Sequence, residues 1–272
     1  MLLVLALAMS VFVLVVAPLI AVCARSFIYI GTDHRTVLTI RWYLALFNSI
    51  DSGAWWNTLY VSGTVAVLGA ALGFVGALNW WTPRRMYLLL ASSFVISSLP
   101  AAAEAAALAY SFRLFGIHRS TWELLVAAHA VWVVPFCTVI ILAAFSAVSE
   151  SQVGAAFELS KGNRFVVARK VILPIVGPAL ASSALIAFLL SINEYVRTMY
   201  LSGSIDLLSR KINGMMTSGT DPTVYAITGL NIALALAGLT ILAVGIILSR
   251  RLRRPLSITR IPYISHASSR AD

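Results

Sequence analysis

Long apolar runs alternate with short polar segments along most of the chain. Each run has about the 20 residues that a helix needs to cross about 30 Å of hydrocarbon. The polar segments between the runs contain the turn-forming residues and nearly all the charged ones. The pattern therefore predicts a membrane protein with six spanning helices. Their expected positions are residues 2–24, 55–78, 86–111, 122–147, 175–198 and 224–248.

The predicted span 55–78 is rich in glycine. Gly69 and Gly73 are four residues apart, so they share one face of a helix and let a second backbone approach closely. This spacing predicts a tight helix–helix contact. It indicates no particular function, since small-residue seams are common in helical membrane proteins.

The composition agrees with a protein that lies in lipid. Of 272 residues, 60% are hydrophobic and only 11% are charged, and a soluble domain could not bury that much apolar surface. The net charge of +10 comes from basic residues at the ends of the apolar runs, which favours membrane loops over nucleic-acid binding. Both cysteines fall in apolar runs, so we expect no disulfide.

The distribution of basic residues predicts the orientation. An even number of spans puts both termini on one side, together with Arg84, Arg85, the basic segment 149–174 and an arginine-rich tail. Cytoplasmic loops are enriched in Lys and Arg, so we expect both termini in the cytoplasm. The first run lacks a basic start and is long enough to span, which favours an uncleaved helix over a signal peptide.

One segment between two spans is unusually polar: residues 154–174 read GAAFELSKGNRFVVARKVILP. We predict a short helix that stops at Gly162, then a second amphipathic piece, with Pro174 in the first turn of the next span. From these residues alone, two interpretations stay open. The segment is either an interfacial helix lying on lipid headgroups or a docking site for a protein.

With its Ala155-Ala156, Gly162 and Ile172-Leu173-Pro174, this segment resembles the cytoplasmic loop of binding-protein-dependent ABC importer permeases. The family pattern is Glu-Ala-Ala, three residues, Gly, nine residues, Ile-x-Leu-Pro. Here Gly154 replaces the glutamate, the gap before Gly162 is longer and the last motif is shortened. Residues 55–78 resemble the second span of that family. Three further stretches, residues 99–112, 127–145 and 191–203, resemble in order its spermidine/putrescine branch.

The resemblance implies an all-α membrane protein with six transmembrane helices and the type I ABC importer permease (MetI-like) fold. Residues 1–54 would form the first transmembrane helix and an outer loop. Residues 55–254 would form the core permease domain with its coupling loop at 149–174, and residues 255–272 a cytoplasmic tail. The implied function is that of a permease subunit of an ATP-driven importer for polyamine or a related small charged solute. Within the family, 2-aminoethylphosphonate, thiamine and ferric ion are alternative cargoes.

The resemblance also implies partners and a location. These are cytoplasmic ABC ATPase subunits, a second permease chain that is homologous or identical, and a periplasmic or extracellular solute-binding protein, all at a bacterial inner membrane with its lipid. The sequence has no G-x-x-x-x-G-K-[ST] phosphate loop. We therefore expect no cofactor and no enzymatic activity in this chain, with ATP and magnesium on the partner ATPase. No nucleic-acid partner is expected.

In the family, the loop's short coupling helix sits in a groove of the ATPase and passes its motion to the spans. Small alanines permit close approach, Phe157 and Leu159 offer apolar anchors, and Lys161 and Arg164 can pair with a rim. The residues assigned to this role are Gly154, Ala155, Ala156, Phe157, Glu158, Leu159, Lys161, Gly162, Arg164, Ile172, Leu173 and Pro174.

Two acidic residues, Glu104 and Glu194, fall within predicted spans, where a charge costs at least a few kcal/mol unless it is paired or wetted. They either lie on a path for a cationic solute, or pair with Arg113 or Arg197, or form hydrogen bonds between helices. His129 is a second ambiguous residue, because a lone histidine in an apolar helix is more often a hydrogen-bonded packing residue. The candidate substrate path consists of Glu104, Glu194, Tyr195 and His129, with Trp132 and Tyr110 as further aromatic contacts for an ammonium.

Two other classes of protein would leave signals that the sequence lacks. An ion-coupled secondary carrier would show inverted repeats with broken midplane helices, and we find no convincing repeat. An intramembrane enzyme would need a convergent set of nucleophile and base, or a metal cluster, and no such spacing occurs. The segments 25–54, 113–121 and 199–222 are expected as outer loops, where a solute-binding protein would dock.

Overall fold

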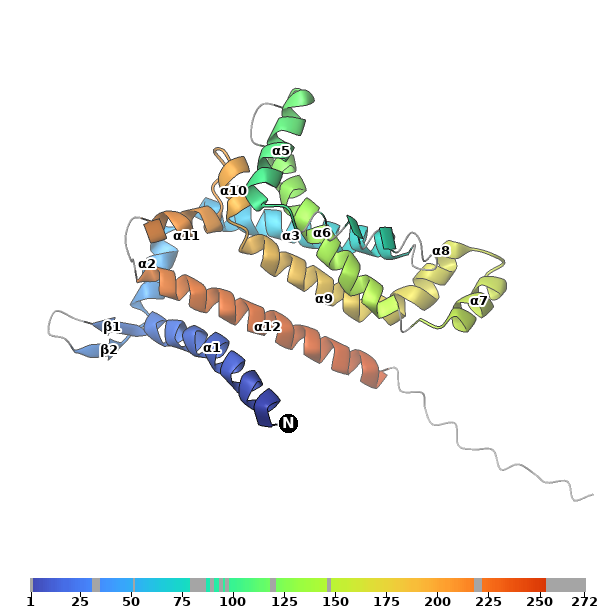
Figure 1. Cartoon of the computed structure of the whole chain (residues 1–272), viewed down its shortest axis with the longest axis horizontal. Helices are drawn as coiled ribbons and strands as arrows, with labels where there is room; N and C mark the ends of the chain where they lie inside the picture. The colour runs from blue at the N-terminus through green and yellow to red at the C-terminus, as the bar shows by residue number, and fades with distance from the viewer. Residues whose placement is uncertain are drawn as a thin grey trace, which may run out of the picture.

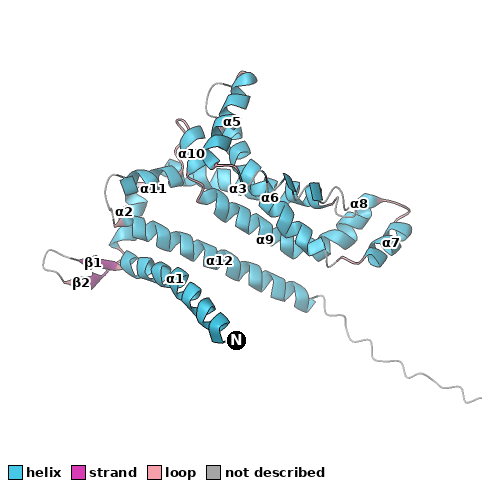
Figure 2. Cartoon of the chain, viewed as in Figure 1, coloured by secondary structure: helices cyan, strands magenta, loops and turns pink. Residues whose placement is uncertain are grey.

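The computed structural model describes residues 2–30, 35–50, 52–78, 87–88, 91–92, 95, 98–117, 121–145, 148–217 and 222–252. The described part is almost entirely helical, with one small hairpin (Figure 2). The long helices are α1 (Leu2–Ser26), α3 (Ser52–Ala77), α6 (Trp122–Phe145), α9 (Leu173–Ile192) and α12 (Thr223–Leu252). The shorter ones are α2 (Arg41–Ser49), α5 (Ala101–Leu114), α7 (Glu150–Leu159), α8 (Arg164–Val167), α10 (Val196–Leu201) and α11 (Leu208–Thr217).

Four helical segments are long and apolar enough to cross a membrane. They are Ser52–Ala77, Trp122–Phe145, Arg164–Ile192 and Thr223–Ile247. These segments correspond to four of the predicted spans, and the predicted span 2–24 forms α1. Of the predicted span 86–111, the structure describes mainly the part in α5, so a total of six spans stays a prediction. Arg84, Arg85 and the tail 255–272 lie outside the described residues.

The predicted span 175–198 is wrong at both ends. A continuous helical segment already begins at Arg164 and includes a π-helical turn, η1 (Ala168–Ile172), before it continues as α9. Pro174 lies in the first turn of α9, as expected. A proline has no N–H and crowds the preceding turn, and the wider π turn accommodates that defect without ending the helix. At the other end α9 stops at Ile192, and α10 begins only at Val196.

The outer segment 25–54 also differs from the prediction, because it is not merely a loop. Strands β1 (Ile28–Ile30) and β2 (Thr36–Leu38) pair antiparallel, with Ile28 opposite Leu38. The β-branched residues of both strands explain the local preference for extended backbone. Helix α2 follows directly. The fold is therefore helical with a small β-hairpin rather than strictly all-α.

The main core lies where α3, α6 and α9 pack side by side, and α12 lies along α9 with α1 beside it (Figure 1). The predicted glycine contact is confirmed on the α3 face that meets α6. A Cβ added to Gly69 would lie 3.0 Å from the free thiol sulfur of Cys137, and one added to Gly73 would lie 3.0 Å from the Cys137 backbone carbon. These glycines let the two helix backbones touch.

A second, smaller core joins the elements at the end of the bundle that bears the hairpin. Residues from α2, α3, α11 and α12 form it, among them Leu46, Leu208 and Ile227. Two hydrogen bonds fix the segment before α11 against α3. The Leu208 N–H donates to Thr58 Oγ1 at 2.8 Å, and Asn57 Nδ2 donates to the Asp206 carbonyl at 3.0 Å. This core holds α11 close to the break between α9 and α10.

Candidate functional site

The helix break at Asn193–Tyr195 is caused by side chains that compete with the backbone for hydrogen bonds. Asn193 Nδ2 donates to the Leu189 carbonyl at 2.8 Å, which an N–H four residues later would otherwise use. Glu194 Oε1 accepts the Arg197 N–H at 3.1 Å, so this carboxylate caps the first turn of α10. The break turns Glu194 toward α10, while Asn193 and Tyr195 line a pocket on another side.

A buried ion cluster lies directly beside the break. Arg197 Nη1 donates to Glu194 Oε2 at 2.9 Å, and Arg197 Nε donates to Glu104 Oε2 at 3.2 Å, with a second contact from Nη2 to the same oxygen. The side chains of Arg197 and Glu104 are 5% exposed and that of Glu194 is 11% exposed. Counted in their ionised forms, two carboxylates and one guanidinium give the cluster a formal charge of −1. Glu104 belongs to α5, so the ion pair ties α5 to α10.

Some buried polar atoms in and beside the cluster have no hydrogen-bond partner among the described residues. Within the described residues, Glu104 Oε1 and Trp132 Nε1 are buried without a hydrogen-bond partner. The Trp132 ring, on α6, lies 5.1 Å from the Arg197 guanidinium carbon, a distance typical of a cation–π contact. A buried carboxylate oxygen with no donor is costly, and an additional cation or hydrogen-bond donor would stabilise it.

His129 lies next to the cluster and both of its ring nitrogens are occupied. Nδ1 lies 2.8 Å from Ser191 Oγ, and Nε2 lies 3.2 Å from Thr198 Oγ1. The Thr198 hydroxyl already donates its proton to the Glu194 carbonyl at 2.6 Å. We therefore assign the ring proton to Nε2, which leaves Nδ1 to accept from Ser191. His129 is thus a buried link between α6, α9 and α10.

A pocket of about 480 Å³ lies on the opposite side of the break, between the end of α9, α11 and α12. It has aliphatic walls and several neutral polar side chains but no charged lining residue among those described. Asn213 Nδ2 donates to the Tyr195 hydroxyl at 2.7 Å, and Asn231 Nδ2 donates to Asn193 Oδ1 at 3.0 Å. The amide oxygens of Asn213 and Asn231 accept no hydrogen bond from the described residues, so the pocket offers acceptors to a ligand that donates.

The structure divides the four candidate path residues between two places. Glu104, Glu194 and His129 belong to one buried network that Arg197 and Thr198 join. Tyr195 lies apart and lines the polar pocket. The expected aromatic contacts do not gather around one point, because Trp132 lies over Arg197 and Tyr110 is 65% exposed.

Sequence reasoning missed part of this site. It considered Arg197 as a partner of either glutamate but not as the link between both. It also missed the pocket amides Asn213 and Asn231. The available signals were an asparagine inside the apolar run of α12 and a strongly amphipathic α11.

The coupling segment forms at the other end of the bundle. Helix α7 packs against α8 and η1 through Val153, which is buried, and Ala156, which is half-buried. Its other face is exposed. That face includes Gly154, Ala155, Glu158 and Leu159, the last of them 87% exposed. Ala156 thus contacts this chain's own core rather than a partner-facing surface.

The predicted stop at Gly162 is confirmed. Lys161 and Gly162 adopt positive φ angles of 54° and 79°, and the Gly162 N–H donates to the Phe157 carbonyl at 2.9 Å. The Asn163 side chain then caps α8 by accepting from the Phe165 N–H at 3.1 Å. Beyond this turn Arg164 is exposed, Ile172 is buried, and Leu173 and Pro174 open α9.

The fold and these sites define a membrane-spanning permease subunit of an ABC transporter. A solved amino acid ABC transporter with bound histidines shares the fold at a TM-score of 0.54 and 20% identity, over 77% of this chain and 95% of that chain. No family model matches the sequence.

Two curated relatives identify the branch. The spermidine/putrescine transport system permease protein PotC of Escherichia coli (strain K12) is 30% identical over 203 residues, which cover 73% of this chain and 76% of that protein. PotC of Haemophilus influenzae is 28% identical over 201 residues, 72% of this chain and 77% of that protein. The chain therefore belongs to the PotC family of ABC importer permease subunits, and the resemblance inferred from the sequence is confirmed.

Proposed function

We propose that this chain moves a polyamine, or a related small cation, across the inner membrane as one of two permease subunits of an ATP-driven importer. The observation that carries the proposal is the buried Glu104–Arg197–Glu194 cluster with its net negative charge. A cationic solute offsets a buried negative charge, whereas an anionic one is repelled. The cargo named for the curated relatives has the same sign of charge.

The polar pocket supports the same cargo chemistry. A polyamine is a chain of methylene groups between ammonium groups. Aliphatic walls such as Ile212 and Ile227 suit the methylenes, while the free oxygens of Asn213 and Asn231 suit ammonium donors. Tyr195 adds an aromatic ring to the pocket lining. We place the cargo path along the pocket and the cluster, where Arg197 exchanges partners as a cation passes.

The coupling role rests on the exposed face of α7 and on what α7 is attached to. A partner ATPase would receive Leu159 and Phe157, which are 87% and 39% exposed. Helix α7 packs on α8 and η1, the start of the 29-residue helical segment Arg164–Ile192. At 1.5 Å per residue this segment is about 43 Å long, and it ends beside Glu194. Motion of α7 would therefore reach the ion cluster through one continuous element.

The proposed ATPase contact of α7 would also set the orientation in the membrane. With α7 on the cytoplasmic side, Lys161, Arg164, Arg169 and Lys170 face the cytoplasm, as basic loop residues usually do. The hairpin, α2 and α11 lie at the other end of the bundle, where a solute-binding protein would dock (Figure 1). ATP and magnesium would bind to the partner ATPase, and the second permease chain would complete the pathway.

Competition in whole cells tests the cargo. The chain would be expressed with the ATPase, second permease and binding protein of its own gene neighbourhood, and uptake of labelled putrescine would be measured. We expect unlabelled spermidine to compete, and 2-aminoethylphosphonate, thiamine and ferric ion not to. Glu104→Gln should lower uptake at least tenfold, while Glu123→Gln on the exposed first turn of α6 should leave it unchanged. Saturable uptake of one of the other solutes, without polyamine competition, would refute the polyamine assignment.

A further inference from the structure

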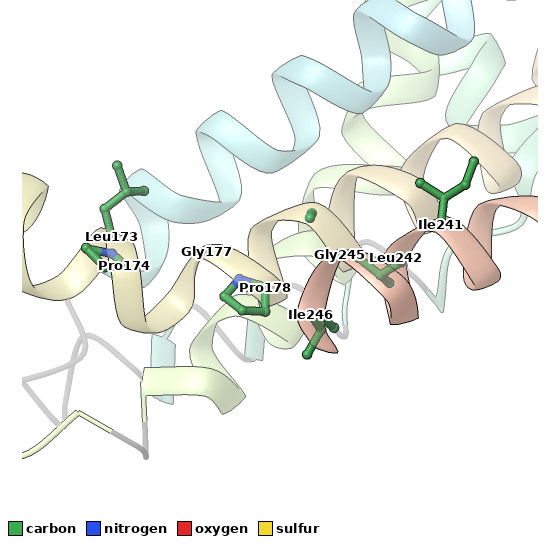
Figure 3. A pocket seen from close by; sticks show the side chains of 9 residues that line it. Leu173, Pro174, Gly177, Pro178, Ile241, Leu242, Gly245 and Ile246 are labelled. Atoms are coloured by element: carbon green, nitrogen blue, oxygen red, sulfur yellow. The ribbon is translucent and has the colours of Figure 1, made fainter. Parts of the chain in front are cut away.

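Helices α9 and α12 are in contact, and the Leu185 side chain of α9 packs over Gly238 of α12. A Cβ added to Gly238 would lie 2.6 Å from Leu185 Cδ1, so no space is left between the helices at that level. Nearer to η1 they enclose a groove of about 390 Å³ (Figure 3). Its lining is entirely apolar and consists of Leu173, Pro174, Gly177, Pro178, Ala181, Ile241, Leu242, Gly245 and Ile246.

Two observations show that the groove is unfilled and accessible from outside this chain. A Cβ added to Gly177 or Gly245 would meet no heavy atom within 4 Å, so empty space lies directly above both backbones. From Leu230 to Ile247, α12 has no buried residue, and Ile241 at the edge of the groove is 74% exposed. The groove therefore opens on the outside of this chain's helix bundle.

Two basic residues precede the groove-lining residues Leu173 and Pro174 in the same continuous helical segment. Arg169 and Lys170, in η1, are exposed and form no ion pair or side-chain hydrogen bond with the described part of the chain. They precede Leu173 and Pro174 by four residues, about one helical turn, so they share the face that lines the groove. Arg169 and Lys170 thus place two positive charges next to the apolar groove, where the basic segment joins the spanning part of the helix.

We propose that the groove binds one anionic phospholipid, with an acyl chain between α9 and α12 and the phosphate on Arg169 and Lys170. An acyl chain gains little by leaving the bilayer for an equally apolar groove, so the apolar fit alone does not select a ligand. The negative charge of the headgroup is what selects an anionic phospholipid. A packed protein helix would also suit the glycine floor, but it would leave both basic residues without a partner.

The site has a consequence for coupling. It includes Pro174 and borders η1, where the long helical segment departs from regular α-helix. A bound lipid would hold α9 and α12 together next to the segment that carries α7. Binding is nevertheless independent of the cargo and can be measured without transport.

Native mass spectrometry of the purified full-length chain tests the proposal. Phosphatidylglycerol and phosphatidylcholine with identical acyl chains would be titrated onto delipidated protein. We expect retained phosphatidylglycerol and little phosphatidylcholine. Each basic residue near a membrane surface contributes roughly fivefold to lipid affinity, so Arg169→Gln with Lys170→Gln should weaken phosphatidylglycerol binding about 30-fold. The exchange Arg169→Lys with Lys170→Arg keeps both positive charges, so this variant should bind phosphatidylglycerol like the wild type.

Two controls separate the headgroup from the groove. Arg35→Gln with Arg113→Gln removes the same charge at exposed positions elsewhere and should change binding less than twofold. Gly177→Leu fills the groove, keeps both charges and should lower binding about tenfold, whereas inorganic phosphate should not compete. For the unmodified protein, photoreactive phosphatidylglycerol should crosslink to α9 and α12 near Gly177 and Gly245.

Equal retention of both lipids would overturn the proposal, and so would crosslinks confined to other helices. A third contrary result is that Gly177→Leu abolishes a two-chain assembly while phosphatidylglycerol binding persists. The groove would then be a contact with another protein chain.

Discussion

The two ends of the helical segment Arg164–Ile192 are built in opposite ways. At the η1 end, α7 presents exposed apolar and small side chains, and its contacts are with residues close in the sequence. At the other end, Arg197 pairs with Glu194 and with Glu104, which is 93 positions away in the sequence, in a buried cluster. We propose that a partner covers the first end, whereas the second end is already buried within this chain and contains charged residues. A change at the exposed end should therefore affect coupling without affecting folding, whereas removal of the Arg197 guanidinium from the buried cluster should affect folding as well.

Removing the guanidinium should have the largest effect. Arg197→Met leaves Glu104 and Glu194 buried without their counter-ion, and breaking a buried ion pair in this way costs about 3–5 kcal/mol. We expect a strongly lowered thermal unfolding midpoint of the detergent-purified chain. Adding Glu104→Gln and Glu194→Gln to Arg197→Met should recover most of the lost stability. If Arg197→Met has the same unfolding midpoint as the wild type, the cluster contributes no net stability. The proposed difference between the two ends of the segment would then be wrong.

The matching change at the exposed end is Leu159→Asp. Because Leu159 is 87% exposed, stability should change by less than about 0.5 kcal/mol. Pull-down of the ATPase and cation uptake should each fall at least tenfold if α7 docks there. Gln152→Glu, an exposed change near the start of the same helix, should preserve both. Normal ATPase binding by Leu159→Asp would show that the ATPase does not dock on this face of α7.

A smaller effect is expected at the turn after α7. Gly162 has a φ of 79°, a region that is unfavourable for residues with a Cβ, so Gly162→Ala should cost about 1 kcal/mol. Gly154 lies inside α7 with nothing within 4 Å of an added Cβ. Gly154→Ala should therefore stabilise α7 by up to about 1 kcal/mol. Chemical unfolding of both variants, with the local opening of α7 followed by hydrogen exchange, distinguishes these outcomes. Equal effects of the same sign would contradict the assigned turn.

The smallest predicted effect is in the polar pocket. Asn213→Ala removes a hydrogen bond to the Tyr195 hydroxyl and one free acceptor oxygen. A neutral hydrogen bond contributes about 1 kcal/mol, so apparent affinity for the cation in uptake assays should weaken by roughly fivefold. Tyr195→Phe should have a similar effect. Unchanged uptake kinetics in both variants would show that the pocket is not part of the cargo path.

What the sequence predicted is mostly local. The stop at Gly162, Pro174 in a first turn and the Gly69–Gly73 seam each depend on a few neighbouring residues or on one helix face. The link from Glu104 to Arg197 depends on how α5 meets α10, and no nearby spacing encodes it. The break at Asn193 was missed because apolar residues continue on both sides, although Asn193 and Glu194 carry the competing hydrogen-bonding groups. The π turn was missed because Pro174 reads as the start of a new helix.

ATP-driven uptake of labelled putrescine into proteoliposomes, with the complete transporter reconstituted, tests the central claim most directly. For the wild type, uptake should require ATP. Leu159→Asp should abolish uptake together with transport-coupled ATP hydrolysis, whereas Glu104→Gln should abolish uptake while the assembled complex and its ATP hydrolysis persist. Uptake that proceeds without ATP, or that survives both substitutions, would contradict the account of an externally driven permease with an acidic cation path.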